Sequence, residues 1–327
     1  MKTLVAFLTV LVIAVSGLAQ TGDSDSILRY EYLREISPDL KYGVLEIKNC
    51  GKSRMERKNA PIMETRLVEI LDLKQSGFRN LCQLPDSMLY CTFHDSVTLA
   101  IVTVPNFDDS PALSELLLFD LQRQGARTSL HSVDVKSPNN DWKTVLTFGM
   151  FKMKDSLVVY MDPVDSSTGE IAMTHTKTVV RCMTCSDSMP VVASIPMTLE
   201  PVFSLDGRSV LASRLDRSME SAALIRYDLD RHTATELKSI PFFWHAPQCA
   251  SSESPIYYLG LGAPFNTASE NIWRYDPVTD ENSVLTDYSE PQQVTRFYLT
   301  PDSIVYEVET TLSNEYTLRW ESLSIRP

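Results

Sequence analysis

Short apolar runs alternate with turn-forming residues along most of the chain, which is typical of β-strands rather than helices. One example is the turn Ser37-Pro38-Asp39, which comes just before the apolar run from Tyr42 to Leu45. Pro presets φ at a turn, while Asp and Gly tolerate unusual backbone angles there. The pattern therefore predicts a series of short strands joined by tight turns.

This turn recurs along the chain with an acidic residue as its landmark. Most successive landmarks are about 48 residues apart, within the range of repeat architectures, and they fall at Asp39, Asp86, Asp155, Asp206, Glu253 and Asp302. A second landmark follows, an apolar or aromatic residue and then an acid, at Leu71-Asp72, Phe119-Asp120, Tyr227-Asp228, Tyr275-Asp276 and Trp320-Glu321. The third repeat has no clear copy of it.

A repeat of this length fits four short strands and their turns, which make one blade of a β-propeller. The first landmark is then the turn between the first two strands of a blade, and the second ends the third strand. Six landmarks predict an all-β propeller of six blades with insertions in the first half of the chain. The longer interval from Asp86 to Asp155 leaves a seventh blade as the alternative.

Two stretches of the second half resemble the blades of TolB-like six-bladed propellers. The first is the run from Ser204 to Leu211 together with Ile225 to Leu229, and the second is the run from Ile272 to Thr279. The resemblance implies the fold, is clearest over residues 200–327, and carries no catalytic residue.

The N-terminus has the three parts of a signal peptide. Lys2 is followed by an apolar run from Leu4 to Val15 and by small residues at Gly17 and Ala19. The apolar run is shorter than the ~20 residues that span a bilayer. We therefore expect residues 1–19 to be a cleaved signal peptide, residues 20–327 to form a single propeller domain, and the mature protein to be secreted and extracellular.

Composition narrows the classes of partner. With 43% hydrophobic and 22% charged residues the chain has the profile of a globular protein, and its net charge is −12. An acidic surface repels phosphate groups, so neither nucleic acid nor an anionic membrane is an expected partner.

All six cysteines lie in the predicted mature chain, and an even number in an exported protein favours disulfides. Cys182 and Cys185 are predicted to bridge locally, because no second Cys-x-x-Cys and no thioredoxin-like context accompany them. Cys82 and Cys91 flank a plausible turn and are predicted to pair. Cys50 and Cys249 then remain as partners by elimination.

No catalytic motif stands out. The chain lacks a Gly-x-Ser-x-Gly elbow, a phosphate-binding glycine loop and a His-Glu-x-x-His helix, and its five histidines have no ligand spacing. No cofactor and no metal site are predicted, and no residue is assigned as catalytic.

The most aromatic run, from Pro241 to Pro247, precedes the fifth turn, where the innermost strand of a blade is expected. Trp244 and His245 would point to opposite faces of that strand. Both are candidate ligand-binding residues: one should pack between blades while the other faces the central channel. Packing is the favoured role for Trp244, and His245 is the better candidate for a polar ligand contact.

These observations favour a secreted, non-catalytic propeller that binds a protein, glycan or small ligand on one face of the ring. The alternative is a propeller hydrolase or lyase with its active site in the central channel. Inward-facing His, Asp, Glu or Arg side chains from three or more blades, gathered at one mouth of the channel, would favour the enzyme, whereas a flat apolar face would favour the binding protein.

Overall fold

The computed structural model describes residues 28–325, with gaps at 38, 40, 51–64, 73–78, 85–87, 104–107, 109–111, 124–125, 135–150, 163–175, 186–188, 216–221, 241–244, 262–268 and 313–314. Every regular element in the described part of the chain is a β-strand. No helix among these residues is long and apolar enough to cross a membrane. The predicted signal peptide lies outside the described residues.

The strands form six antiparallel sheets, five with four strands and one with three, as counted over the described residues. Blade 1 contains β1 (Leu28–Ile36), β2 (Tyr42–Cys50), β3 (Thr65–Asp72) and β4 (Arg79–Gln83). Blade 2 contains β5 (Met88–Phe93), β6 (Thr98–Thr103), β7 (Leu113–Asp120) and β8 (Ala126–Asp134). Blade 3 contains β9 (Lys152–Lys154), β10 (Leu157–Asp162), β11 (Lys177–Cys182) and β12 (Val191–Pro196).

Blade 4 contains β13 (Thr198–Phe203), β14 (Ser209–Leu215), β15 (Ala222–Asp228) and β16 (Thr233–Ile240). Blade 5 contains β17 (His245–Cys249), β18 (Ile256–Leu261), β19 (Glu270–Asp276) and β20 (Glu281–Val284). Blade 6 contains β21 (Gln292–Leu299), β22 (Ser303–Leu312) and β23 (Glu315–Ser324). Each sheet is built from strands consecutive in sequence, so the described residues contain no blade shared between the two ends of the chain.

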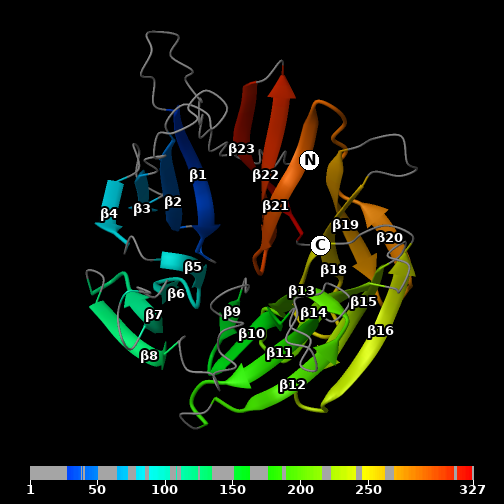
Figure 1. The fold of residues 1–327 in the computed structure, drawn as a ribbon. Coiled ribbons are helices and arrows are strands. Elements are labelled where there is room, and N and C mark those ends of the chain that lie inside the picture. The colour runs from blue at the N-terminus through cyan, green and yellow to red at the C-terminus, as the bar shows by residue number, and fades with distance from the viewer. Residues whose placement is uncertain are drawn as a thin grey trace, which may run out of the picture.

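The blades are arranged radially around a common centre, as in a β-propeller (Figure 1). The first strand of each blade is the innermost, because β1 packs beside β5, β5 beside β9, β9 beside β13, β13 beside β17, and β17 beside β21. The six sheets agree with the prediction of six blades, and the described residues contain no seventh sheet.

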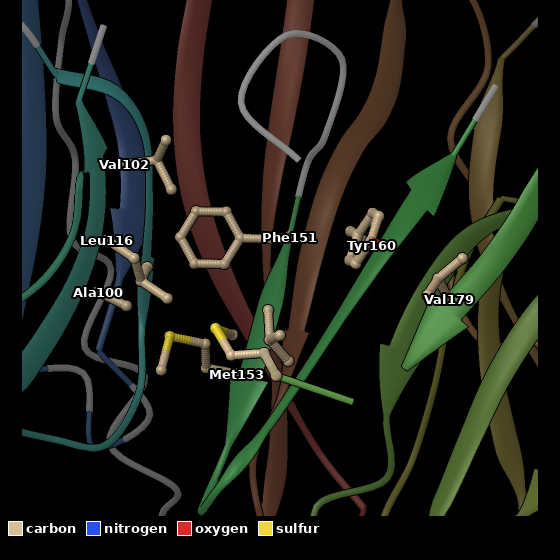
Figure 2. Packing of buried hydrophobic residues seen from close by; sticks show 9 residues of the cluster. Ala100, Val102, Leu116, Phe151, Met153, Tyr160 and Val179 are labelled. Atoms are coloured by element: carbon tan, nitrogen blue, oxygen red, sulfur yellow. The ribbon is translucent and has the colours of Figure 1, made fainter. Parts of the chain in front are cut away.

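Apolar clusters between neighbouring blades form the core. Figure 2 shows the cluster between blades 2 and 3, where Phe151, Met153 and Tyr160 meet Val102 and residues from the same two sheets. Similar clusters join blades 1 and 2, 3 and 4, 4 and 5, and 5 and 6. Because blades 2–5 each bury both faces against their neighbours, their central strands are apolar on both faces: all but the first residue of β6, for instance, are buried.

The turns between first and second strands confirm five of the six first landmarks. The side chain of Asp39 accepts hydrogen bonds from Ser37 Oγ (2.7 Å) and from the Lys41 backbone N–H (3.1 Å). Asp206 repeats this geometry with Ser204 Oγ (2.6 Å) and the Arg208 N–H (3.1 Å). In these two turns a short acidic side chain holds the backbone, whereas in blades 5 and 6 the hydroxyl of Ser254 or Thr300 does so.

The landmark at Asp86 was assigned to the wrong connection. It lies between β4 and β5, where the chain passes from blade 1 to blade 2. In blade 2 the corresponding turn is formed around Asp95, whose carboxylate accepts the N–H groups of Val97 (2.8 Å) and Thr98 (2.7 Å). Pro-Asp-Ser suits any tight connection, so its chemistry did not distinguish the two.

The second landmarks end the third strand in blades 1, 2, 4 and 5, as predicted, at Asp72, Asp120, Asp228 and Asp276. Asp228, for example, accepts the N–H groups of Asp230 (3.0 Å) and Arg231 (2.8 Å). In blade 3 the position belongs to Cys182, the last residue of β11, which is disulfide-bonded to Cys185. A covalent bridge thus replaces the acid-capped turn. In blade 6 Glu321 lies inside β23 rather than at its end.

The local bridge between Cys182 and Cys185 is confirmed, but the other two predicted disulfides are wrong. Cys91 and Cys249 are both buried thiols. Cys82 is in the outermost strand of blade 1 and Cys91 in the innermost strand of blade 2, so they lie at opposite edges of their blades. Burial raises the pKa of the Cys249 thiol to about 12, and Asp206 adds to this effect. Cys50 ends β2; its side chain lies outside the described residues.

The two ends of the ring differ in their connections. At one end, the turn end, the first strand joins the second and the third joins the fourth through short segments such as 204–208 and 277–280. At the other, the loop end, the second strand joins the third and each blade joins the next. The longest connections between described strands are all at the loop end, at 51–64, 104–112, 135–151 and 163–176. These are the insertions predicted for the first half.

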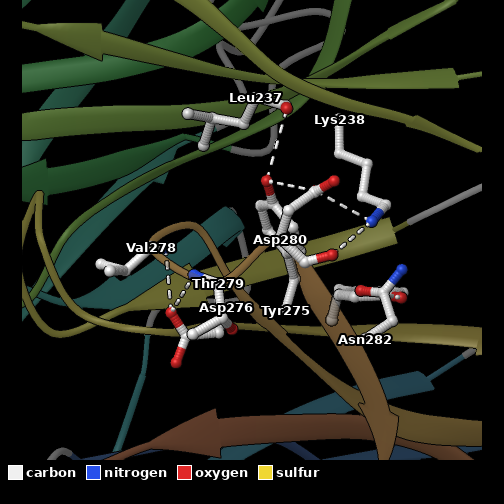
Figure 3. A network of polar contacts seen from close by, with 9 residues as sticks. Leu237, Lys238, Tyr275, Asp276, Val278, Thr279, Asp280 and Asn282 are labelled. Atoms are coloured by element: carbon white, nitrogen blue, oxygen red, sulfur yellow. Dashed lines mark hydrogen bonds and ion pairs between the residues drawn. The ribbon is translucent and has the colours of Figure 1, made fainter.

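A polar network at the turn end ties blade 4 to blade 5 (Figure 3). Lys238 Nζ donates to Asp280 Oδ1 (2.9 Å) and to the Asp280 backbone carbonyl (2.9 Å), and Tyr275 Oη donates to Asp280 Oδ1 (3.2 Å). The hydrogen bond from Lys238, followed by that from Tyr275, lowers the pKa of the Asp280 carboxyl.

Replacement of Asp280 by asparagine is therefore expected to lower stability at neutral pH but not in acid. Because the folded-state pKa is lowered, the stabilisation is complete well above the ordinary Asp pKa of about 3.9 and is lost as the pH falls below it. Urea midpoints of the two proteins should differ near pH 7 and converge as the pH approaches the lowered pKa. Glu281→Gln, which removes an exposed carboxylate from the adjacent strand, is the control. A midpoint difference that persists unchanged in acid would contradict this account.

Candidate functional site

The innermost strands of five blades each carry a β-bulge against their neighbour. A bulge adds a residue to one strand and changes the direction in which nearby side chains point, and bulges are common next to functional sites. The irregularities lie at Leu33/Glu35, Met88/Tyr90, Leu199/Val202, His245/Gln248 and Val294/Arg296. Similar irregularities occur between the third and fourth strands of blades 1–4, so they do not single out the centre of the ring. The innermost strands nevertheless bring charged side chains of several blades together there.

One charged pair bridges two blades that are not neighbours. Lys152 Nζ, at the start of β9 in blade 3, donates to Glu35 Oε1, near the end of β1 in blade 1 (2.9 Å). The same ammonium group donates to Thr92 Oγ1 on β5 (3.3 Å), in the blade between them. The Glu35 side chain is 13% exposed and that of Lys152 36%, so the pair is partly shielded from water.

A second charged pair lies on blade 6. Arg296 binds the Glu307 carboxylate through two hydrogen bonds, from Nε to Oε1 (3.1 Å) and from an η nitrogen to Oε2 (2.7 Å). Thr295 Oγ1 also donates to Glu307 Oε1 (2.7 Å). Only 6% of the Glu307 side chain is exposed. Its charge is therefore balanced by a bidentate guanidinium, the geometry that suits a buried carboxylate.

Two aromatic rings complete the cluster on blade 6. The Arg296 guanidinium lies over the ring of Trp320, 5.2 Å from its centroid, and Tyr298 lies beside Trp320 at 5.9 Å between ring centroids. Trp320 is only 5% exposed. These contacts fix the plane of the guanidinium that binds Glu307.

Electrostatic coupling links the two pairs. Burial raises the pKa of the Tyr298 hydroxyl, and the carboxylate of Glu35 on blade 1 raises it further. Burial by itself would lower the pKa of Arg296, but Tyr298, Glu307 and Glu35 outweigh it and raise that pKa. We name the set Glu35, Thr92, Lys152, Arg296, Tyr298, Glu307 and Trp320 the central cluster. It draws on blades 1, 2, 3 and 6, and near neutral pH Tyr298 is neutral and Arg296 charged.

A further carboxylate joins the inner strands of blades 4 and 5. Glu200 Oε2 accepts the backbone N–H of Ala246 (2.6 Å), and both residues have a positive φ, of 51° and 50°. Non-glycine residues seldom adopt this conformation, and each costs free energy that the surrounding bulges must offset. Each residue precedes a proline, Pro201 or Pro247, in corresponding positions of the two blades. Glu200 therefore holds two strained inner strands in register.

The structure places the sequence candidates only in part. His245 is the first residue of β17, the innermost strand of blade 5, where its backbone pairs with Leu259. This is the strand expected for it, but the direction of its side chain stays a prediction. Trp244 lies outside the described residues. The members of the central cluster were not indicated as site residues by the sequence.

The central cluster has one feature that favours an enzyme and one that opposes it. It offers acidic, basic and hydroxyl groups from several blades, as expected of the enzyme alternative. Each of its carboxylates is, however, already bound to a cation: Glu35 to Lys152 and Glu307 to Arg296. A general base must reach a substrate proton, whereas the oxygens of a carboxylate in a bidentate pair already accept hydrogen bonds from the cation. Such a carboxylate is poorly placed to act as a base. The Lys152–Glu35 pair thus braces blade 3 against blade 1, and the Arg296–Glu307 pair joins two strands of blade 6.

No protein-family model matches the chain, and no curated protein matches it in sequence. Solved structures do match in fold. The β-propeller domain of the Trilobed protease from Pyrococcus furiosus, described as having an open velcro topology, aligns with a TM-score of 0.53 and 14% identity over 91% of this chain and 84% of that one. An oligogalacturonate lyase from Vibrio parahaemolyticus aligns with a TM-score of 0.50 and 8% identity over 96% of both chains.

TolB from Acinetobacter baumannii is also similar, with a TM-score of 0.45 and 12% identity over 87% of this chain and 81% of that one. At this level of identity the likenesses concern the fold. The two matches with TM-scores of 0.50 and above confirm the β-propeller fold that the sequence resemblance implied, and the matched proteins have different activities.

Proposed function

We propose that the chain is a secreted, non-catalytic β-propeller that binds a protein, glycan or small ligand at the loop end of its ring. Export is supported by Lys2, the apolar run from Leu4 to Val15, and the small residue Ala19. The acidic net charge of −12 favours a partner that is neutral or basic rather than a nucleic acid.

The observation that carries the proposal is the difference between the two ends. Several of the short segments at the turn end have backbone N–H groups bound by Asp side chains, so these groups are not available to a partner. The loop end carries the longest connections between described strands. Loops on a rigid scaffold are where binding residues are most often found. His245 starts its strand at this end, so its predicted ligand contact belongs to the same face.

A hydrolase or lyase with its site at the centre of the ring is the second candidate. The observation in its favour is that charged groups from blades 1, 3 and 6 gather in the central cluster. The pairing of each carboxylate with a cation supports the binding protein instead.

One preparation of the exported chain can test both functions. It is applied to arrays of glycans and of extracellular protein domains, and is assayed in parallel for turnover of ester, peptide and glycosidic substrates. We expect saturable binding to at least one class and no turnover above that of the Glu35→Gln variant. Turnover that Glu35→Gln abolishes while the fold is retained would reject the proposal in favour of the enzyme.

A further inference from the structure

The Cys182–Cys185 disulfide presents its two sulfurs very differently to solvent. Cys182 ends β11 and is 4% exposed, whereas Cys185 lies in the following turn and is exposed. Thiol–disulfide exchange requires an incoming thiolate to reach one sulfur along the bond, so access decides which sulfur is attacked. Here only the Cys185 sulfur is on an exposed residue.

The turn around this disulfide is held by contacts that do not depend on it. The Cys182 N–H donates to the Pro190 carbonyl (3.1 Å), and the Met183 N–H donates to the Ser156 carbonyl (2.7 Å). Arg181 donates to the carbonyl of Met189 (2.9 Å), a residue 1% exposed within the apolar cluster of Figure 2. Opening the disulfide would therefore leave the two flanking strands anchored.

Corresponding turns elsewhere in the ring form without a bridge. Asp120, Asp228 and Asp276 stand where Cys182 stands, and each binds two backbone N–H groups of its turn. The propeller thus makes this connection with hydrogen bonds alone, so blade 3 does not need the covalent bond to complete its sheet.

A hydroxyl lies within reach of the buried sulfur. Thr184 Oγ1 is 3.9 Å from Cys182 Sγ. If Cys182 becomes a thiolate, the hydroxyl can donate to it, because a thiolate only accepts. Such a donor stabilises the leaving group of an exchange reaction.

We propose that the turn is a thiol–disulfide exchange site in which Cys185 is the attacked sulfur and Cys182 the leaving one. A thiolate from another molecule forms a bond to Cys185 Sγ as the Sγ–Sγ bond breaks. The electron pair passes to Cys182 Sγ, which then takes up a proton. A second thiol attacks the sulfur of the incoming molecule, releasing Cys185 as a thiol and the two external thiols as their disulfide. Two external thiols are oxidised and the protein disulfide is reduced. The site is separate from the proposed binding end, because it lies at the turn end.

Reduced glutathione is the probe for the test. The folded wild-type chain is incubated with it and quenched with acid, and mixed disulfides are located by peptide mapping. We expect glutathione on Cys185, with circular dichroism unchanged. Glutathione on Cys182, or attachment only when the chain unfolds, would overturn the proposal.

A matched pair of variants gives the second readout. In Cys182→Ala the remaining Cys185 should react with an alkylating reagent at least about tenfold faster than Cys182 does in Cys185→Ala, because only exposed thiols with thiolate character react readily. The buried thiols of Cys91 and Cys249 are common to both variants and map to other peptides. Equal rates in two folded variants would also overturn the proposal.

Discussion

Trp320→Ala is expected to lower the free energy of unfolding by about 3–5 kcal/mol, the usual cost of truncating a buried large aromatic residue. Trp320 is 5% exposed, and its ring contacts both Tyr298 and the Arg296 guanidinium. The variant loses the transfer free energy of the indole and leaves a cavity beside a charge that was shielded by it. Urea denaturation followed by circular dichroism measures the change.

Val278→Ala is the matched control for that experiment. Val278 is 82% exposed in a turn of blade 5, so its truncation should change stability by less than about 0.5 kcal/mol. An unaltered urea midpoint for Trp320→Ala would show that the ring of Trp320 is not packed in blade 6 as the structure has it.

The second large effect concerns the buried charge on the same blade. Glu307→Ala is expected to cost about 3–5 kcal/mol, because it leaves the partly buried Arg296 without its bidentate partner. Thr295 loses its carboxylate acceptor as well. Thermal or urea unfolding at low and high salt measures the loss, which should depend only weakly on salt because the pair is shielded.

A double variant separates the pair from the packing around it. In Arg296→Met with Glu307→Leu both charges are replaced by apolar groups of similar length, and much of the stability should return. If Glu307→Ala alone is neutral or stabilising, the carboxylate is not part of a structural brace. That result would favour the enzyme, since functional polar groups are often held at a cost in stability.

Much of the fold could be predicted from the sequence because the turn residues of the blades recur at a regular spacing. A turn such as Ser204 to Arg208 needs particular residues at particular positions, so it leaves a local signal that recurs in each blade. The same logic identified the ends of the third strands at Asp228 and Asp276. It failed at Asp86, because a connection between blades uses the same residues as a turn within one.

The central cluster could not be found in this way. Glu35, Lys152 and Arg296 lie far apart in the sequence and come together only because each lies on the innermost strand of a different blade. Which innermost strands lie beside one another depends on the closure of the ring, which leaves no fixed spacing between these residues in the sequence. One partial signal was present: Glu200-Pro201 and Ala246-Pro247 occupy the same position relative to the following turn, which marks two equivalent distortions.

The number of cysteines did not by itself predict which of them form disulfides. An even number suggested three bridges, but only a pair with its Cα atoms within about 7 Å can be joined without moving the backbone. Cys182 and Cys185 meet this condition at 5.7 Å. Cys91 and Cys249 instead pack into the apolar clusters between blades, as small hydrophobic side chains do.

Binding by the two ends of the ring, compared with matched variants, is the most direct test of the proposed function. Leu113 is 45% exposed at the start of β7, at the loop end, and Val278 is 82% exposed at the turn end. Each is replaced by arginine, and the affinity for the strongest array ligand is measured by surface plasmon resonance. The account predicts that Leu113→Arg weakens binding by about tenfold or more, the loss of 1.4 kcal/mol, whereas Val278→Arg leaves it unchanged. Weakened binding by Val278→Arg, with Leu113→Arg unaffected, would contradict the assignment of the loop end as the binding face.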